Sequence, residues 1–219
     1  MTVPPRPSRA VLLGVEPDGA GRHPAAWRLP GAEPAALFGP DRAVALARLA
    51  DAADLDLLVV PDSFRLQGAV GPGPVDEVRG RLDAVALAAR TAPTTRRVGV
   101  APVVTTTHTE PFHTSKALAT LDIVSGGRAG WQIGVSDSAA EADAFGRKGV
   151  EPDGELWAEA AEAAAVVRLL WDSWEDDAVV RDTATGRYVD RDKLHHVDFR
   201  GERFSVKGPS ITPRPPQGQ

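Results

Sequence analysis

Residues 97–135 read RVGVAPVVTTTHTEPFHTSKALATLDIVSGGRAGWQIGV, and this stretch decides the fold class. It begins with a nearly continuous apolar run at 97–104, continues with a helical pattern at 110–124, and ends with a second apolar run at 130–135. Short apolar runs that do not alternate with polar residues are typical of strands buried on both faces. The stretch therefore predicts a strand, a helix and a parallel strand joined by a right-handed crossover.

The same pattern extends outward from this unit in both directions. Asp41 and Asp153 are predicted to cap two of the flanking helices, because a carboxylate can accept hydrogen bonds from the free N–H groups of a first turn. The alternation of strands and helices predicts an α/β protein with a parallel sheet. A doubly wound open sheet and an αβ barrel both fit the pattern. The further predicted strands and helices are, in chain order, 11–15, 41–54, 56–60, 75–91 and 154–174.

The character of the sequence changes after Trp174, which divides the chain into 10–174 and 175–219. Residues 175–207 are polar and charged, with short extended pieces predicted at 187–189 and 203–206, so we expect an insertion that contains β-structure. The last segment, 208–219, is rich in proline and is expected to be extended and mobile.

Composition narrows the classes of function. The net charge of −5 argues against a general affinity for nucleic acid or for an anionic membrane surface. The absence of cysteine excludes disulfides, thiolate metal sites and cysteine nucleophiles. No run of 18 apolar residues is present, and residues 1–9 lack the apolar stretch of a secretory signal, so we expect a cytoplasmic protein.

Polar residues follow each predicted strand. In parallel αβ folds ligands bind at the carboxyl ends of the strands, so these residues predict a site at one edge of the sheet. The alternative is that they only cap turns and satisfy backbone groups. The residues concerned are Glu16 after the first strand, with His23 and Trp27 across the following loop; Asp62, Ser63 and Phe64 after the second; Thr105, Thr106, Thr107 and His108 after the third; and Ser136, Asp137 and Ser138 after the fourth.

Common catalytic motifs are incomplete in this sequence. Residues 71–74 (GPGP) lack the third glycine and the preceding strand of a dinucleotide-binding loop, and residues 134–138 (GVSDS) lack the closing glycine of a nucleophile elbow. Histidines at 108 and 113, and at 195 and 196, have no supporting carboxylate pattern, so no metal site is predicted. Acidic residues including Glu141 and Asp143 are expected on the solvated surface.

Three longer phrases carry a family resemblance: LDIVSGGRAGW at 121–131, LWDSWEDDA at 170–178, and the Gly-Pro and Pro-Arg-Pro-Pro-Gln-Gly pieces within 208–218. Together they resemble the nitrilotriacetate monooxygenase component A branch of the luciferase-like flavin-dependent monooxygenases. Within the first phrase we expect Asp122 and Arg128 to pair at the end of a helix, with the glycines permitting a tight turn into the next strand.

The resemblance implies a (β/α)8 TIM barrel, of which this chain would form the first four β/α units and the start of an insertion. Relatives in this family continue for roughly as many residues again, so the sheet of this chain is expected to leave open edges. The resemblance further implies reduced FMN delivered by a separate flavin reductase, O2 as co-substrate, a small organic substrate, and assembly into a homo- or hetero-oligomer.

The positions that would contact FMN match the family unevenly, and no catalytic residue is assigned. Each departure removes or relocates a polar contact, at about 1 kcal/mol apiece. Two alternatives therefore stay open: a non-catalytic subunit that supports a catalytic partner, and an unrelated open-sheet protein. The implied flavin contacts are Asp62 and Ser63 near the ring, Ser136 at the phosphate, Trp157 in place of a phosphate-binding tyrosine, Val103 in place of a threonine and Gln132 in place of an asparagine; Phe112 and Val135 also differ from the family's tyrosine and threonine.

Overall fold

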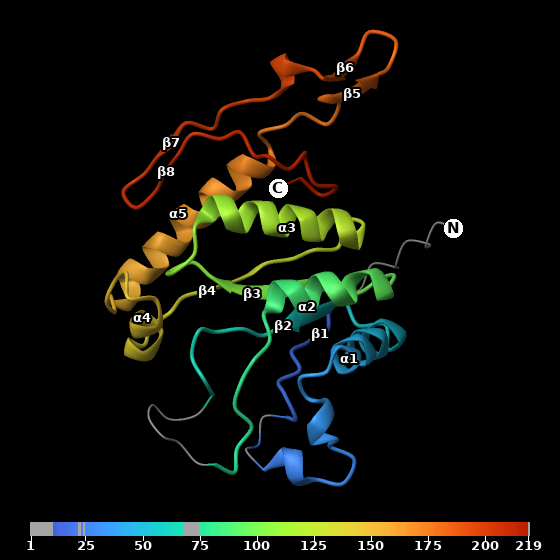
Figure 1. Cartoon of the computed structure of the whole chain (residues 1–219), viewed down its shortest axis with the longest axis vertical. Coiled ribbons are helices and arrows are strands. Elements are labelled where there is room, and N and C mark those ends of the chain that lie inside the picture. Colours follow the sequence, from blue (N-terminus) through green and yellow to red (C-terminus); the bar gives the residue numbers. More distant parts are fainter. Residues whose placement is uncertain (1–10, 22, 24, 68–74, 219) are drawn as a thin grey trace.

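The computed structural model describes residues 11–21, 23, 25–67 and 75–218 (Figure 1). Its main sheet has four parallel strands in the spatial order β1-β2-β3-β4, which is also their order along the chain. The proline-rich start at 1–9 and the Gly-Pro run at 71–74 lie outside the described residues. The strands are β1 (Gly14–Val15), β2 (Leu57–Val60), β3 (Gly99–Thr105) and β4 (Gln132–Gly134).

Helices connect consecutive strands, so the predicted alternation of strands and helices is confirmed. Short 3-10 helices lie at Ala26–Arg28, Pro34–Ala36, Ala92–Thr94 and Arg191–Lys193. No helix among the described residues is long and apolar enough to cross a membrane. The α-helices are α1 (Pro40–Ala52), α2 (Ala84–Thr91), α3 (Pro111–Ser125), α4 (Ala139–Phe145) and α5 (Asp153–Trp171).

Strand order separates the two architectures that the sequence left open. A doubly wound sheet reverses its direction of growth at a switch point, whereas a barrel adds each new strand on the same side of the previous one. The sequential order β1-β2-β3-β4 is the barrel order. With right-handed crossovers, this order also places the connecting helices on one face of the sheet. The molecule is therefore a partial barrel, and the open-sheet alternative is wrong.

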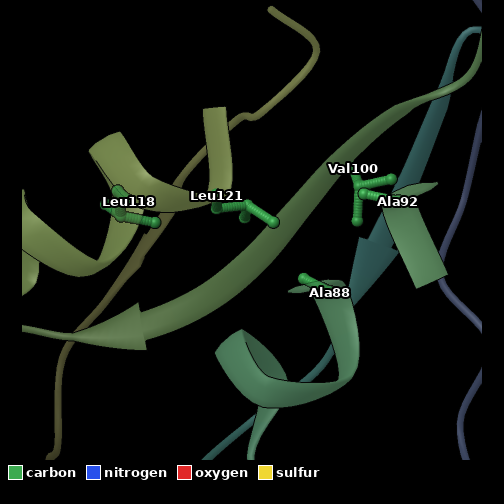
Figure 2. Packing of buried hydrophobic residues seen from close by; sticks show 5 residues of the cluster. All are labelled: Ala88, Ala92, Val100, Leu118 and Leu121. Atoms are coloured by element: carbon green, nitrogen blue, oxygen red, sulfur yellow. The ribbon is translucent and has the colours of Figure 1, made fainter. Parts of the chain in front are cut away.

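The hydrophobic core lies between the sheet and these helices. Val100 of β3 is fully buried against Ala88 and Ala92 on one side and Leu118 and Leu121 on the other (Figure 2). Small alanines on α2 let the helix approach the strand closely, and the leucines of α3 fill the remaining space. A second cluster joins α1 to the sheet through Ala47, Ala50, Leu58 and Val98.

The opposite face of the sheet is much less covered by the described residues. Leu58 is 3% exposed on the helix-covered face, while its neighbour Leu57 is 37% exposed on the other. Leu57 lies between Gly14 and Gly99 on the adjacent strands, so no side chain flanks it there. This open inner face corresponds to the interior of a barrel.

Several predicted helix boundaries were wrong. The helix predicted at 75–91 begins only at Ala84, because Gly80 adopts a φ of +111° and Asp83 caps the helix by accepting from Ala86 N–H. Asp41 and Asp153 lie within the first turns of α1 and α5, and neither is the capping residue, since Gly39 and Pro152 hold those positions. The predicted end of the last helix at 174 was also late, since α5 ends at Trp171.

The turn between α3 and β4 confirms one expectation and corrects another. Gly126 and Gly127 have φ values of +69° and +80°, so the glycines do make the tight turn. Asp122 and Arg128 do not pair with each other. Asp122 accepts hydrogen bonds from Ala129 N–H and from the backbone and side chain of Gln217. The Arg128 guanidinium instead donates to carbonyl oxygens between α2 and β3.

Two hairpins follow α5, and they contain the predicted extended pieces (Figure 1). The first pairs β5 (Val179–Asp182) with β6 (Arg187–Val189), and the second pairs β7 (Phe199–Arg200) with β8 (Ser205–Val206). The Glu162 carboxylate on α5 holds the turn of the second hairpin by accepting from the backbone N–H groups of Glu202, Arg203 and Phe204.

Residues 208–218 lie outside regular helices and strands, and they are tied down at several points. Ser210 N–H donates to the Ser173 hydroxyl, and the Trp174 indole donates to the Ser210 carbonyl. Gln217 bonds Asp122 at the end of α3. These bonds join residues 36 to 95 positions apart in the sequence, so the local composition that predicted a mobile tail could not indicate them.

Candidate functional site

The four parallel strands end at the same edge of the sheet, where some of the polar residues that follow them come together. An open hollow of about 590 Å³ lies at this edge. Four of the six residues that the resemblance assigns to the flavin line it: Asp62, Ser63, Val103 and Gln132. They belong to three different strands or strand ends, which only the parallel pairing brings together.

Asp62 fixes the geometry of the loop after β2. Its Oδ2 accepts from Ala84 N–H at the start of α2, at 2.8 Å, and its Oδ1 accepts from Ser63 N–H, also at 2.8 Å. Burial raises the pKa of the Asp62 carboxyl, and these two hydrogen bonds only partly oppose it. The residue therefore joins β2 to α2 and also presents a carboxyl with a raised pKa to the hollow, a property common at functional sites.

Val103 and Gln132 form the floor of the hollow. They are direct partners across the β3–β4 pair, so both lie on the inner face of the sheet. Gly134 follows two residues later on the same face, and a Cβ there would lie 3.3 Å from Val103 Cγ1. The glycine therefore keeps the floor flat, with an apolar patch beside a side-chain amide.

Ser136 and Trp157 are placed differently from the other four residues. The Ser136 hydroxyl is buried and shares a hydrogen bond of 3.0 Å with the Thr105 hydroxyl, and Ser136 N–H donates to Thr107. Trp157 lies on α5 with 53% of its surface exposed. Neither residue lines the hollow around Asp62. The positions predicted to contact the phosphate therefore lie outside the lining of this hollow.

An aromatic cluster joins the loops after β2 and β3 to α4. The His108 ring stacks on Phe145 at a centroid distance of 4.6 Å, and Phe64 meets Phe145 edge-on at the same distance. Burial lowers the pKa of His108, and the positive charge of Lys148 adds to this effect. The lowered pKa favours the neutral imidazole, which packs as a ring against Phe145.

Glu141 on α4 corrects the expectation of a solvated acid. It is 3% exposed, and its carboxylate accepts from Phe64 N–H at 3.1 Å and from the Ser138 hydroxyl at 2.8 Å. Ser138 in turn caps α4 by accepting from Glu141 N–H. Serine followed three residues later by glutamate is the capping-box pattern, so this signal was present in the sequence.

Arg81 is a second residue that the sequence did not identify, because it fell inside a predicted helix. In the structure it precedes α2 and lines the hollow together with Asp62 and Gln132. Among the described residues, no group of three histidine, cysteine or acidic side chains is arranged to hold a metal ion.

Comparison with known proteins gives a uniform result. The family model for luciferase-like monooxygenases matches residues 19–219. N-acetyl-S-(2-succino)cysteine monooxygenase of Bacillus subtilis (strain 168) is 37% identical over 212 residues, covering 96% of this chain and 47% of that protein. Nitrilotriacetate monooxygenase component A of Aminobacter aminovorans is 36% identical over 211 residues, covering 91% and 46%.

A solved structure agrees with these relatives. Riboflavin lyase, crystallised with modified FMN and riboflavin, superposes with a TM-score of 0.83 at 27% identity, covering 96% of this chain and 48% of the lyase. The chain therefore spans about half the length of the relatives it matches.

Proposed function

Because this chain belongs to the luciferase-like monooxygenase family, we propose that it supplies the first half of a site for reduced FMN in a monooxygenase that acts on a small organic substrate. The observation that carries the proposal is the hollow at the strand ends, where the ring-contacting positions implied by the resemblance come together. Reduced FMN, when bound, supplies the electrons that activate O2 for transfer of one oxygen atom to the substrate.

The residues of the hollow fit the ring of a flavin. The flat apolar floor at Val103, kept open by Gly134, suits one face of an aromatic ring system. The side chains of Ser63 and Gln132, beside this floor, can hydrogen-bond the polar edge of the ring. Asp62 holds the loop that positions Ser63.

The phosphate end fits less completely. Ser136 has the required hydroxyl, which the Thr105 hydroxyl orients, but Trp157 has no hydroxyl to offer a phosphate. We therefore expect weak binding of FMN, since each missing polar contact costs about 1 kcal/mol. The same proposal includes a separate flavin reductase as the source of reduced FMN, and an oligomeric assembly. The printed name of one relative, nitrilotriacetate monooxygenase component A, describes it as one component of a larger system.

The proposal predicts that the chain quenches FMN fluorescence saturably. Gln132→Ala should weaken binding several-fold by removing an amide from the ring edge. Trp157→Tyr should strengthen binding of FMN about tenfold, equivalent to about 1.4 kcal/mol, and leave riboflavin, which lacks the phosphate, unchanged. Absence of saturable quenching at millimolar FMN would contradict the proposal.

A second candidate is a non-catalytic subunit that supports a catalytic partner. The open inner face around Leu57, together with the missing hydroxyl at Trp157, favours it. This candidate predicts a stable hetero-complex and no flavin turnover by the chain alone. A monodisperse monomer that melts cooperatively in analytical ultracentrifugation and calorimetry would count against it.

A further inference from the structure

Side chains of α4 join the loop after β2 to the segment after β4, across the end of β3. β3 lies between these two strands, so the sheet itself does not pair β2 with β4. The loop after β2 carries Ser63, and the segment after β4 carries Ser136. The proposed function places Ser63 beside the flavin ring and Ser136 at its phosphate, so the relative position of the two segments matters to a bound FMN.

Glu141 forms the polar part of this link. Its side chain is buried, its Oε1 accepts from Phe64 N–H at 3.1 Å, and its Oε2 accepts from the Ser138 hydroxyl at 2.8 Å. Phe64 directly follows Ser63, and Ser138 lies two residues after Ser136. One carboxylate therefore holds both segments by charge-assisted hydrogen bonds.

Phe145 forms the apolar part of the link, one helical turn after Glu141. Its ring meets Phe64 edge-on and stacks on His108, both at a centroid distance of 4.6 Å, so it contacts the loops after β2 and β3 together. Arg65 and Asp137 also pair at 3.5 Å between the same segments as Glu141, but both side chains are more than half exposed and the pair stabilises little.

The alternative role for Glu141 is to complete the capping box at the start of α4. Its bond to Phe64 N–H reaches 77 positions along the chain, and that bond adds nothing to the helix. Glu141 is only 3% exposed, so moving either segment away would leave a buried carboxylate without its hydrogen bond. The two segments are therefore held in one arrangement.

Resting on the proposed function, we propose that Glu141 is a positioning residue of the flavin site. By holding Phe64 N–H against the start of α4, it sets the distance between Ser63 and Ser136, so that the ring and the phosphate of one FMN molecule meet both side chains together. Glu141 does not line the hollow and acts through the backbone of Phe64. Groups that are already in place lose less conformational entropy when the ligand binds.

Fluorescence titration of the whole chain with FMN, and with riboflavin, which lacks the phosphate, tests this role. Glu141→Gln keeps the reach of the side chain, and its amide can accept from Phe64 N–H and donate to the Ser138 hydroxyl. Glu141→Asp keeps the charge but is one methylene shorter. We expect Glu141→Gln to bind FMN within threefold of the wild type, and Glu141→Asp and Glu141→Ala to bind it at least tenfold more weakly. Riboflavin, which needs no contact at Ser136, should lose less than threefold in every variant.

Asp51→Asn is the matched control. Asp51 also joins a helix to a loop by accepting backbone N–H groups, at the end of the sheet opposite the hollow. Its substitution should lower stability and leave the affinity for FMN within twofold of the wild type. Thermal unfolding of each variant gives the temperature below which the titrated protein is folded, and Glu141→Asp takes the place of Glu141→Ala if the alanine variant does not fold.

The proposal is overturned if Glu141→Asp binds FMN within twofold of the wild type, or if riboflavin loses as much affinity as FMN, since Glu141 would then support only the fold. Equal losses in Glu141→Gln and Glu141→Asp would also overturn it, because reach would not be the property that matters. An equal loss in Asp51→Asn would show that lowered stability alone weakens binding.

Failure of the wild type to bind FMN contradicts the proposed function instead. Hydrogen exchange without flavin still tests the link made by Glu141 in that case. Glu141→Asp should speed exchange at residues 62–67 at least tenfold, and Asp51→Asn should not. Unchanged exchange in Glu141→Asp would mean that Glu141 does not hold the loop after β2, and the proposal would be wrong.

Discussion

Single carboxylates that accept several backbone N–H groups recur at the joints of this chain. Asp51, at the end of α1, accepts from the consecutive N–H groups of Arg96, Arg97 and Val98 just before β3. Glu162 does the same for the turn of the second hairpin. A loop that leaves regular structure must satisfy its donors elsewhere, and one charged acceptor can satisfy three of them.

Asp51→Asn should lower the free energy of unfolding at pH 7 by about 1–3 kcal/mol, because an amide accepts fewer and weaker bonds. Burial alone would raise the pKa of Asp51, but the hydrogen bonds from Val98, Arg97 and Arg96 outweigh it and lower the pKa below 3.8. The folded pKa is thus below the unfolded value, so the stabilisation is present above pH 3.8 and is lost as the pH falls through the folded pKa.

Urea denaturation at pH 7 and near pH 3 measures this difference. The gap between wild type and Asp51→Asn should narrow at the lower pH. Asp143→Asn is the control, because Asp143 is exposed on α4 and its substitution should change stability by less than about 0.5 kcal/mol. A gap that is the same at both pH values would show that the charge of Asp51 does not act as described.

At the scale of elements, Arg128 joins two turns at the end of the sheet opposite the hollow. Its guanidinium donates to the carbonyls of Ala92, Thr95 and Val98, and also to the Thr95 hydroxyl and the Ser125 carbonyl. These acceptors lie at the ends of α2 and α3 and before β3. Burial lowers the pKa of Arg128, and the nearby charge of Asp51 opposes this. These bonds give a structural role to the arginine of the Ser-Gly-Gly-Arg sequence at 125–128.

Arg128→Lys should destabilise the chain by about 2–3 kcal/mol, because an ammonium cannot reach acceptors arranged around a planar fork. Thermal and urea unfolding provide the measurement. Arg90→Lys makes the same exchange at an exposed position on α2 and should have little effect. Equal stability of the two variants would mean that charge, and not the geometry of the guanidinium, holds the turns together.

At the scale of the whole molecule, the sheet has one packed face and one open face. Leu57 and Leu58 test this directly, since they are adjacent on β2 and point to opposite sides. Leu58→Ser should cost about 2–5 kcal/mol by opening the core between β2 and α1. Leu57→Ser should cost less than about 1 kcal/mol and should reduce the binding of an apolar dye. The reverse order of the two losses would mean that the inner face is packed.

The sequence predicted the strands and helices well where local patterns decide them. The apolar run of β3 and the helical pattern of α3 both lie within two residues of their predicted positions. The prediction failed at the start of α2, where the apolar residues at 75–83 have helical spacing. There Gly80, through its contacts with Gln67 and Phe38, holds the backbone in another conformation. Short α4 was missed for a similar reason, since its buried acid resembles a surface residue.

The candidate site also has features that the sequence could indicate and features that it could not. The polar residues after each strand were recognisable, since their position depends only on where the strands end. The lack of a partner for Arg81 Nε among the described residues, and the position of Ser136 outside the hollow, were not recognisable, because both depend on neighbours far away in the chain. Likewise, the partners of Asp122 and Arg128 lie up to 95 residues away, and no spacing rule indicates them.

By itself the sequence determined the parallel βα order and, through its longer phrases, the family. Hydrophobic periodicity and turn residues report local burial and backbone conformation, and these are enough for both conclusions. Only the tertiary structure decided that the strands follow one another in barrel order, that one sheet face stays open, and that Asp62, Ser63, Val103 and Gln132 line one hollow. Those features depend on which distant groups meet, and the free energy of such contacts is not written in any local pattern.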